Sequence, residues 1–471
     1  MLPSVNTKII ATLGPATETK DKIEALIDAG VNAFRLNFSH GDYDFFEKLI
    51  FSIRELSEKK NLDIPIMQDL QGPKIRLNKF IKEQKVVAGE TFTLSLCEHI
   101  DDSADKICIT FPYLTKEVNA GQRILIDDGN IELKITEISK DKIVTTVQKG
   151  GTIKPRKGVN LPDTKLSLLS LTEKDLKDLE FGAKHQLDYV ALSFVRSHKD
   201  ISELRTQLKK LKMNAGIIAK IEKPEALIDL ESIVRASDVI LLARGDLGVE
   251  ISLESVPSTQ KRVIDICRRE DTPVLIATQM LESMTNNPVP TRAEVTDVYQ
   301  AVNDGADAVM LSGETAVGCY PAEAVMMMKK IIAESEKNPK LNTNNVGLSE
   351  NTDKAIAATS AEITNKIKAK FICSFTYSGW TAKLLSKTNT QHPIIAFTPF
   401  INTRRKINLY RGVKALNVQD NIDTVDKLIE TANTELKKLG LAKPGDKIVI
   451  VAGQPLGRGG ITNFLKVHTV I

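Results

Sequence analysis

The sequence lacks the features that mark secreted, membrane-bound and nucleic-acid-binding proteins. Its 64 basic and 60 acidic residues leave a formal net charge of only +4, too even a balance to indicate a nucleic acid or a membrane surface as partner. No apolar run approaches the roughly 18 residues that a membrane span needs. The N-terminal stretch has no basic segment followed by a long apolar one, so we expect no secretory signal and a soluble, cytoplasmic protein.

Cysteine is scarce, and no two cysteines are closely spaced. The five cysteines stand singly and form no CxxC motif, so we expect neither a metal cluster nor a disulfide framework, in keeping with a reducing cytosol. They are Cys97, Cys108, Cys267, Cys319 and Cys373.

The remaining composition is that of an ordinary globular protein. Charged residues make up 26% and hydrophobic residues 42% of the 471 positions. A chain of this length is expected to fold into roughly two to four domains and to bury a sizeable core.

Strand and helix patterns alternate over the first 70 residues. Apolar runs at Lys8 to Leu13, Val31 to Phe38 and Ile64 to Leu70 predict parallel strands that are buried on both faces. A helical pattern from Asp21 to Ala29 ends at Gly30, a residue suited to the position after a helix.

The pattern changes between residues 73 and 163. Short alternating runs separated by Gly and Asp turns replace the helices, which predicts a separate all-β lid domain, a small barrel or sandwich. The predicted strands are Thr91 to Leu96, Ile107 to Thr110, Ile124 to Ile126, Ile131 to Ile138 and Ile143 to Gln148.

Strands and helices alternate again from residue 164 to about 345. A helix is expected to begin at a capping box formed by Ser170 and Glu173 and to run to about His185. Three strands before the lid and five after it, within roughly 250 residues, predict a discontinuous (β/α)8 barrel over 1–72 and 164–345. A doubly wound open sheet is the alternative. The later strands are Asp188 to Val195, Gly216 to Glu222, Val239 to Ala243, Pro273 to Gln279 and Ala306 to Leu311.

A third domain, residues 346–471, is predicted after the polar stretch from Asn338 to Asn351. It has strand patterns near Phe371 to Phe375, Ile394 to Phe397 and Ile448 to Val451. An amphipathic helix from about Asp423 stops at Gly440. We therefore expect a C-terminal α/β domain with its own core.

Charged residues gather where the predicted barrel strands end, which is where such barrels form their active sites. Arg35, Asn37 and Ser39 alternate along one strand and share a face, an arrangement that suits an anionic substrate and a cation. Asp69 ends the next strand, and Thr278 ends a later one.

Lys220, Glu222 and Asp246 follow two neighbouring strands. Two carboxylates with open positions suit Mg²⁺ that substrate oxygens and water complete. Lys220 beside that metal would neutralise a phosphate or an enolate oxygen. Singly, each residue is more often an ordinary ion pair or turn residue, but together they indicate phosphoryl transfer.

Eight motifs carry a family resemblance that spans the chain. They are RLNFSHG (35–41), DLQGPKIR (69–76), KGVNLP (157–162), IAKIEKPEAL (218–227), ARGDLGVE (243–250), ATQMLESM (277–284), PTRAEVTDV (290–298) and MLSGETAVGCYPAEAV (310–325). In these motifs and their order the sequence resembles the pyruvate kinase family. The resemblance implies phosphoryl transfer from phosphoenolpyruvate to ADP with Mg²⁺ or Mn²⁺, and it implies a homotetramer.

The resemblance also assigns roles on the phosphoenolpyruvate side of the site. Arg35 and Lys220 would contact the transferring phosphoryl group, and Lys220 would stabilise the enolate. Thr278 and the backbone near Gly245 and Asp246 would seat the substrate carboxylate. Glu222 and Asp246 would hold Mg²⁺. On the nucleotide side, the family pattern matches Asn37, His40, Arg76 and Lys157, the last reaching in from the lid.

One departure from the family pattern bears on K⁺. Many members bind K⁺ through residues matching Asn37, Ser39, Asp69 and the backbone of Leu70, and they carry Glu where this chain has Lys74. An ammonium at that position would supply the missing positive charge and repel K⁺. We therefore expect activity without K⁺; otherwise Lys74 is a surface lysine with no bearing on the site.

A loop in the third domain matches the place where the family binds a phosphorylated effector. Its hydroxyls and backbone N–H groups precede a helix, which suits a phosphate, although some members have Lys and Arg where Tyr377 and Trp380 stand. An ordinary helix cap is the alternative. The candidate effector residues are Thr376, Ser378, Gly379 and Thr381.

Two other functions remain open. The first is a lyase or aldolase that uses the same Mg²⁺–enolate site, which the nucleotide-side residues argue against. The second is a catalytically silent scaffold, which would be expected to have lost the charges at the strand ends.

Overall fold

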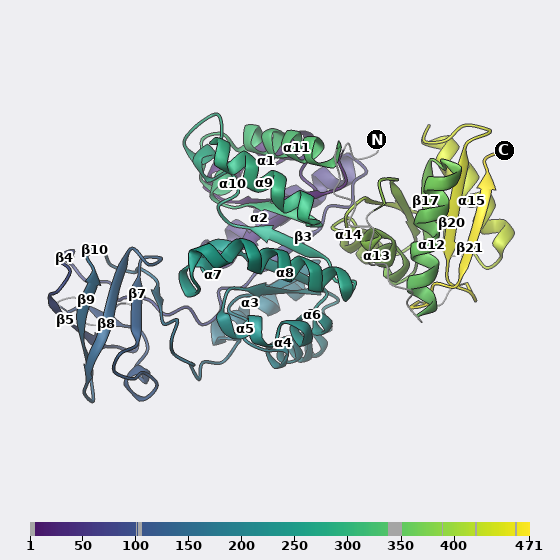
Figure 1. Cartoon of the computed structure of the whole chain (residues 1–471). Helices are drawn as coiled ribbons and strands as arrows, with labels where there is room; N and C mark the ends of the chain where they lie inside the picture. The colour runs from purple at the N-terminus through teal and green to yellow at the C-terminus, as the bar shows by residue number, and fades with distance from the viewer. Residues whose placement is uncertain are drawn as a thin grey trace.

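The computed structural model describes residues 5–99, 101, 106–337, 351–388, 390–419, 422–456 and 459–471. It shows a central barrel, a β-rich lid on one side and an α/β domain on the other (Figure 1). The polar stretch predicted to separate the last two parts lies outside the described residues up to position 350.

Eight parallel strands close into a barrel in the order β1-β16-β15-β14-β13-β12-β3-β2, which confirms the predicted fold. Nearly every strand residue is buried, as expected for a parallel sheet that helices cover on the outside. The strands are β1 Lys8–Leu13, β2 Ala33–Asn37, β3 Ile66–Asp69, β12 Tyr189–Leu192, β13 Gly216–Ile221, β14 Val239–Ala243, β15 Val274–Ala277 and β16 Ala308–Leu311.

Helices follow the strands and supply the outer layer. The barrel interior is itself filled, and Tyr189 is 1% exposed there. Its ring lies so close to Gly216 that a Cβ at that glycine would come within 2.5 Å of it. The helices of this part are α1 Lys20–Ala29, α2 Tyr43–Lys59, α3 Glu173–Lys184, α4 His198–Lys210, α5 Pro224–Ile228, α6 Leu230–Ala236, α7 Arg244–Glu250, α8 Val256–Arg269, α9 Arg292–Asp304, α10 Gly313–Ala316 and α11 Pro321–Lys337, with short 3₁₀ turns at Pro15–Thr17, Leu253–Ser255 and Glu282–Thr285.

The start of α3 differs from the prediction. Thr172, not Ser170, caps the helix: its hydroxyl accepts a hydrogen bond from the N–H of Asp175, and the Asp175 carboxylate accepts one from the N–H of Thr172. The Ser170 hydroxyl instead donates to Glu203 at 2.8 Å. The predicted helix is confirmed, but its predicted capping box is wrong by two residues.

The lid is all-β, built from a six-stranded sheet and a two-stranded one. It also holds a disulfide between Cys97 and Cys108, so the expectation of no disulfide is wrong for this pair. The parallel pairing of β5 with β6 places the two cysteines side by side, which their spacing in the sequence does not reveal. The elements are β4 Gln84–Val86, β5 Thr91–Leu96, β6 Cys108–Ile109, β7 Arg123–Ile126, β8 Ile131–Ile138, β9 Lys142–Lys149, β10 Gly151–Ile153, β11 Val159–Asn160 and a 3₁₀ turn at Leu114–Lys116.

The third part is a five-stranded sheet in the order β19-β18-β17-β20-β21, covered by helices. Its predicted strands are present, and the structure adds β19 and the antiparallel edge strand β21. The elements are α12 Thr352–Ile367, β17 Phe371–Phe375, α13 Trp380–Lys387, β18 Ile394–Thr398, α14 Ile401–Ile407, β19 Val413–Asn417, α15 Val425–Lys438, β20 Lys447–Ala452 and β21 Phe464–Thr469. The proposed domain limits, 1–72 with 164–345, 73–163 and 346–471, stay a prediction.

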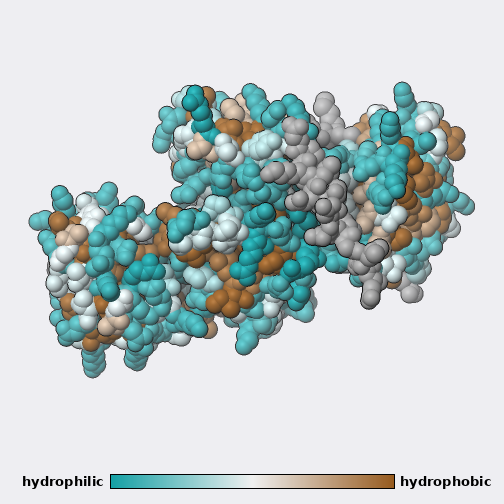
Figure 2. Space-filling view, in the orientation of Figure 1, coloured by the Kyte–Doolittle hydropathy of each residue, from teal (hydrophilic) through white to brown (hydrophobic). Residues whose placement is uncertain are grey.

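The surface is largely hydrophilic on the face drawn in Figure 2, with apolar patches over the barrel and the C-terminal domain. Among the described residues, none of the helices combines the length and the apolar character that crossing a membrane requires.

Candidate active site

A buried charge network lies at the C-terminal ends of β2, β3 and β13. The Arg35 guanidinium contacts the Asp69 carboxylate through Nε at 2.7 Å and through its terminal nitrogen at 2.6 Å. The Lys220 ammonium lies 3.3 Å from Asp69 and 2.9 Å from Glu222. The side chains of Asp69 and Glu222 are 1% and 2% exposed. The structure brings these four strand-end residues together, and their roles stay a prediction.

The network fixes the charge of its members. Burial alone would lower the pKa of Lys220, but the carboxylates of Asp69 and Glu222 hold that pKa above its ordinary value. Burial would likewise raise the pKa of Asp69, yet Lys220 and Arg35 hold it below its usual range. Lys220 is therefore a charged ammonium, and Asp69 a carboxylate, at neutral pH.

Ser193 joins this network, and sequence reasoning missed it. Its hydroxyl accepts a hydrogen bond from the Lys220 ammonium at 2.8 Å and donates one to the backbone oxygen of Leu70, also at 2.8 Å. Ser193 directly follows β12, and this position at a strand end is the sequence feature that could have identified it as a site residue.

The end of β15 holds Thr278 in an unusual conformation. Thr278 and Gln279 have φ values of 68° and 53°, a region that a β-branched residue such as threonine rarely adopts. The N–H of Gly245 donates to the Thr278 hydroxyl at 2.6 Å, and the buried Arg244 donates to the Thr278 carbonyl at 3.1 Å. Strained backbone of this kind persists where the surroundings fix it, and it clusters at functional sites.

Cations surround His40 on the side predicted for the nucleotide. Burial lowers the pKa of His40, and the positive charges of Arg76, Lys74 and Arg35 lower it further. His40 is therefore largely neutral at pH 7, within a region of positive charge that suits a polyphosphate. Asn37, at the end of β2, accepts a hydrogen bond from the N–H of Ser39 and shapes the turn that leads to His40.

Lys157 lies on the lid beside Arg76. The bridge between Arg76 and Gly158 and the hydrogen bond from the N–H of Leu77 to the Lys157 carbonyl, 2.8 Å, place the two cations on adjacent segments. The Lys157 ammonium pairs with Asp127 at 2.7 Å.

A cleft separates the barrel from the lid, with a cavity volume of about 50 Å³. Lys74, Asp128 and Asn160 line it on the lid side, and Asp246 and Phe194 line it on the barrel side. Asp246 lies in the first turn of α7. Burial raises the pKa of Glu222, and the nearby negative charge of Asp246 raises it further. The predicted metal-binding carboxylates are therefore close enough to interact, and Asp246 faces the space that opens toward the lid.

Comparison with known proteins gives one consistent match. The family described as "Pyruvate kinase, barrel domain" matches residues 4–325, and "Pyruvate kinase, alpha/beta domain" matches residues 354–468. The chain belongs to the pyruvate kinase family. A pyruvate kinase of Mycobacterium tuberculosis is 41% identical over 98% of both chains, and one of Thermotoga maritima is 39% identical over 99% of both. A solved pyruvate kinase from Cryptosporidium parvum has a TM-score of 0.91 at 34% identity, covering 99% of this chain and 97% of its own.

In this pyruvate kinase chain, groups at the predicted monovalent-cation position already have partners. Both oxygens of Asp69 lie against the cations of Arg35 and Lys220, and the Leu70 carbonyl accepts from Ser193.

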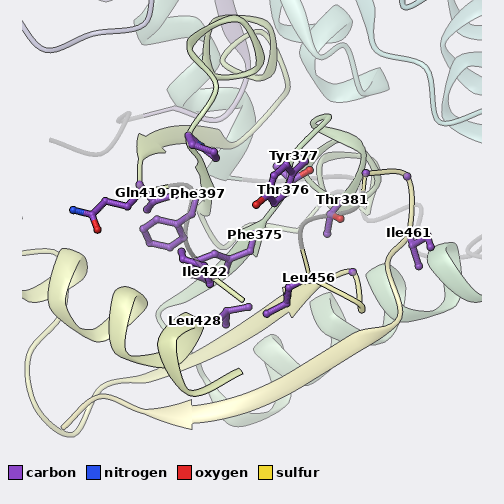
Figure 3. A pocket seen from close by; sticks show the side chains of 15 residues that line it. Phe375, Thr376, Tyr377, Thr381, Phe397, Gln419, Ile422, Leu428, Leu456 and Ile461 are labelled. Atoms are coloured by element: carbon purple, nitrogen blue, oxygen red, sulfur yellow. The ribbon is translucent and has the colours of Figure 1, made fainter. Parts of the chain in front are cut away.

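The predicted effector loop borders a pocket in the C-terminal domain (Figure 3). The Thr376 hydroxyl accepts from the N–H of Gly379 at 3.0 Å, the Ser378 hydroxyl accepts from the N–H of Trp380, and Thr381 bonds to Thr462. Aromatic and aliphatic side chains form the pocket floor, and the described lining contains no Lys or Arg. The loop therefore leads into α13, whose N-cap residue Gly379 has no side-chain cap, beside a largely apolar cavity of about 30 Å³.

Proposed function

We propose that this chain transfers the phosphoryl group of phosphoenolpyruvate to ADP, giving pyruvate and ATP, the last step of glycolysis. Membership of the pyruvate kinase family over the full length supports this reaction. The observation that carries the proposal is the buried network in which Lys220 contacts Asp69 and Glu222 beside Arg35. Phosphoryl transfer relies mainly on positioning and charge neutralisation, and this network holds the two cations Arg35 and Lys220 in fixed positions.

The residues on the phosphoenolpyruvate side have separate tasks in this proposal. Arg35 and Lys220 bind the transferring phosphoryl group. The N–H groups at the start of α7, near Gly245 and Asp246, bind the substrate carboxylate together with the Thr278 hydroxyl. After transfer, the Lys220 ammonium stabilises the enolate oxygen. Two donors can then protonate the enolate carbon: a water, or a relay through Thr278.

The nucleotide side would use Asn37, His40, Arg76 and Lys157. The positive charge around His40 supports this assignment, because ADP brings an anionic polyphosphate to the site. Lys157 would exchange its present partner, Asp127, for the nucleotide.

Glu222 and Asp246 would hold Mg²⁺ or Mn²⁺. Among the described residues, no three His, Cys, Asp or Glu side chains gather as a metal site, so substrate oxygens and water would complete the coordination. The pair fits a divalent cation because Glu222 is buried and the nearby charge of Asp246 adds to the burial that raises its pKa. A bound cation would relieve that repulsion and neutralise charge on the phosphoryl group.

We also propose that K⁺ is not required. Lys74 contributes positive charge at His40, within the site. Because oxygens of Asp69 and Leu70 already have ion-pair or hydrogen-bond partners, fewer oxygen ligands remain for a separate monovalent cation.

Three further proposals rest on the family resemblance. The first is a homotetramer, which the apolar patches in Figure 2 also favour, since such patches often mark interaction surfaces. The second is a cytoplasmic location. The third, a phosphorylated effector bound through Thr376, Ser378, Gly379 and Thr381, stays a prediction.

Product analysis tests the proposed reaction. Incubation of the full chain with phosphoenolpyruvate, ADP and Mg²⁺ should give pyruvate and ATP in equal amounts, and omission of ADP or chelation of the metal should abolish both. Pyruvate formed without any need for nucleotide would favour the lyase alternative. Folded protein that forms neither product would favour the scaffold.

A further inference from the structure

The disulfide in the lid joins the end of β5 to β6. Cys97 and Cys108 are 11 residues apart in sequence, and their Cα atoms are 5.8 Å apart. Cys97 is 8% exposed and Cys108 is 1% exposed. The N–H of Cys97 donates to the carbonyl of Ile109, so backbone pairing and a covalent bond fasten β6 at the same place.

The opposite side of β6 contacts the segment that carries Arg76. The N–H of Asn78 donates to the Cys108 carbonyl at 3.0 Å, and the N–H of Cys108 donates to the Asn78 side chain, also at 3.0 Å. Two residues along, the N–H of Thr110 donates to the Arg76 carbonyl at 2.9 Å, and the N–H of Arg76 donates to the Thr110 hydroxyl at 3.1 Å. β6 and Thr110, which follows it, therefore hold the segment that carries Arg76 at two places, at Arg76 and at Asn78.

The far side of the Arg76 segment contacts the segment that carries Lys157. The N–H of Leu77 donates to the Lys157 carbonyl at 2.8 Å, and the N–H of Arg156 donates to the Asn78 carbonyl at 3.1 Å. A continuous ribbon thus runs from the disulfide through β6 and the Arg76 segment to Lys157. Cys108 belongs to β6, which supports the segments of these two cations, and the disulfide joins Cys97 to it.

We propose that the Cys97–Cys108 disulfide positions Arg76 and Lys157 for the nucleotide, and that its reduction weakens ADP binding while leaving the phosphoenolpyruvate side intact. The inference rests on the proposed nucleotide role of these two cations. The phosphoenolpyruvate side is independent because Arg35 and Lys220 lie on barrel strands β2 and β13, outside the ribbon.

The chemistry is thiol–disulfide exchange with a dithiol. One thiolate of the dithiol attacks the sulfur of Cys97, the more exposed of the two residues, forms a mixed disulfide and releases the Cys108 thiolate. The second thiol then displaces Cys97, so the protein gains two electrons and two protons and the dithiol becomes a disulfide. In the cytoplasmic location proposed above, disulfides are usually transient and redox-sensing, which fits a site with this reversible step.

Steady-state kinetics of the full chain in its two redox states test the proposal. Protein reduced with dithiothreitol should show a KM for ADP raised roughly tenfold, because small misplacements of binding groups have large effects. The KM for phosphoenolpyruvate and kcat at saturating ADP should change little. Treatment with oxidised glutathione should restore the low KM. Intact mass and thiol titration report the redox state in each assay.

Two variants complete the test. Cys97→Ser with Cys108→Ser should show the raised KM for ADP in both redox states, and Cys319→Ser, at an exposed free cysteine, should respond to dithiothreitol as the wild type does. The proposal is overturned if the KM for ADP is the same before and after verified reduction, if both KM values rise together, or if the oxidised chain never forms this disulfide. If the double variant does not fold, reduction of the wild type decides alone. Absence of turnover in the oxidised chain would instead refute the proposed function.

Discussion

At the scale of the residue, the site depends on a lysine that stays charged although it is buried. Removal of one member of a buried ion pair leaves an uncompensated charge, which is strongly unfavourable. Here Asp69 and Glu222 on one side and Ser193 on the other satisfy the Lys220 ammonium. The same contacts fix the position of its charge at the C-terminal ends of the barrel strands.

The charge of Lys74 gives a testable prediction about dependence on K⁺. Turnover of the wild type should be equal in K⁺-free buffer and after addition of K⁺, because Lys74 supplies positive charge near His40. Lys74→Glu removes that charge and adds a carboxylate, so its activity should fall and then rise with added K⁺. Lys74→Gln is the matched control, which should lose activity without a comparable gain from K⁺. Strong K⁺ activation of the wild type at saturating substrates would contradict the account.

Single residues at the strand ends could be predicted because barrel topology alone brings them together. Arg35, Lys220 and Glu222 needed only the rule that active sites form at this edge. Ser193 was missed because a serine after an apolar strand is common, and its bonds to Lys220 and Leu70 join residues far apart in the sequence.

At the scale of the element, the start of α3 shows that a sequence pattern alone does not identify the residue that caps a helix. Both Ser170 and Thr172 precede α3, and each has a carboxylate three residues on. Tertiary contacts decide between them, because the Ser170 hydroxyl is taken by Glu203 of α4. The disulfide was missed for a similar reason: strand pairing, not sequence spacing, brings Cys97 to Cys108.

The capping of α3 gives a prediction at this scale. Thr172→Ala removes the hydroxyl that accepts from the N–H of Asp175 and should lower stability by about 1 kcal/mol. Thr172→Ser keeps the hydroxyl and should stay close to the wild type. Urea unfolding followed by circular dichroism measures the difference. Equal losses in both variants would show that the cap is not the source of the effect.

At the scale of the whole molecule, the barrel and the C-terminal domain are joined through buried charge. The Lys8 ammonium, on β1, donates to the Val413 carbonyl, on β19, at 2.7 Å. Burial lowers the pKa of Lys8 from 10.5 to about 8, so the charged form is less favourable in the folded chain than in the unfolded one.

This contact predicts how stability depends on pH. Between pH 8 and 10.5 the unfolded chain binds more protons at Lys8 than the folded chain does, so this residue makes stability rise with pH in that window. Compared with that of Lys8→Met, the free energy of unfolding of the wild type should therefore rise by up to about 3 kcal/mol between pH 8 and pH 10.5. Thermal unfolding of both proteins at pH 8 and pH 10 measures the gain. A difference in Tm that is the same at both pH values would contradict it.

The overall architecture could be predicted almost completely, because eight strand patterns of one polarity and a β-rich interruption leave few arrangements. The added strands β19 and β21 show the limit: their residues are only partly buried, so their apolar pattern is weak. The proposed site combines residues of the barrel and the lid, and no single segment of sequence reveals that combination.

The most direct test of the account measures turnover of phosphoenolpyruvate and ADP, coupled to lactate dehydrogenase, for the wild type, Lys220→Gln and Lys387→Gln. Lys387 forms an equally buried ion pair with Asp307, which precedes β16 at the opposite end of the barrel. The wild type should be active, kcat should fall about a hundredfold to a thousandfold in Lys220→Gln, and kcat of Lys387→Gln should stay near that of the wild type. Equal losses in the two variants, or a fully active Lys220→Gln, would contradict it.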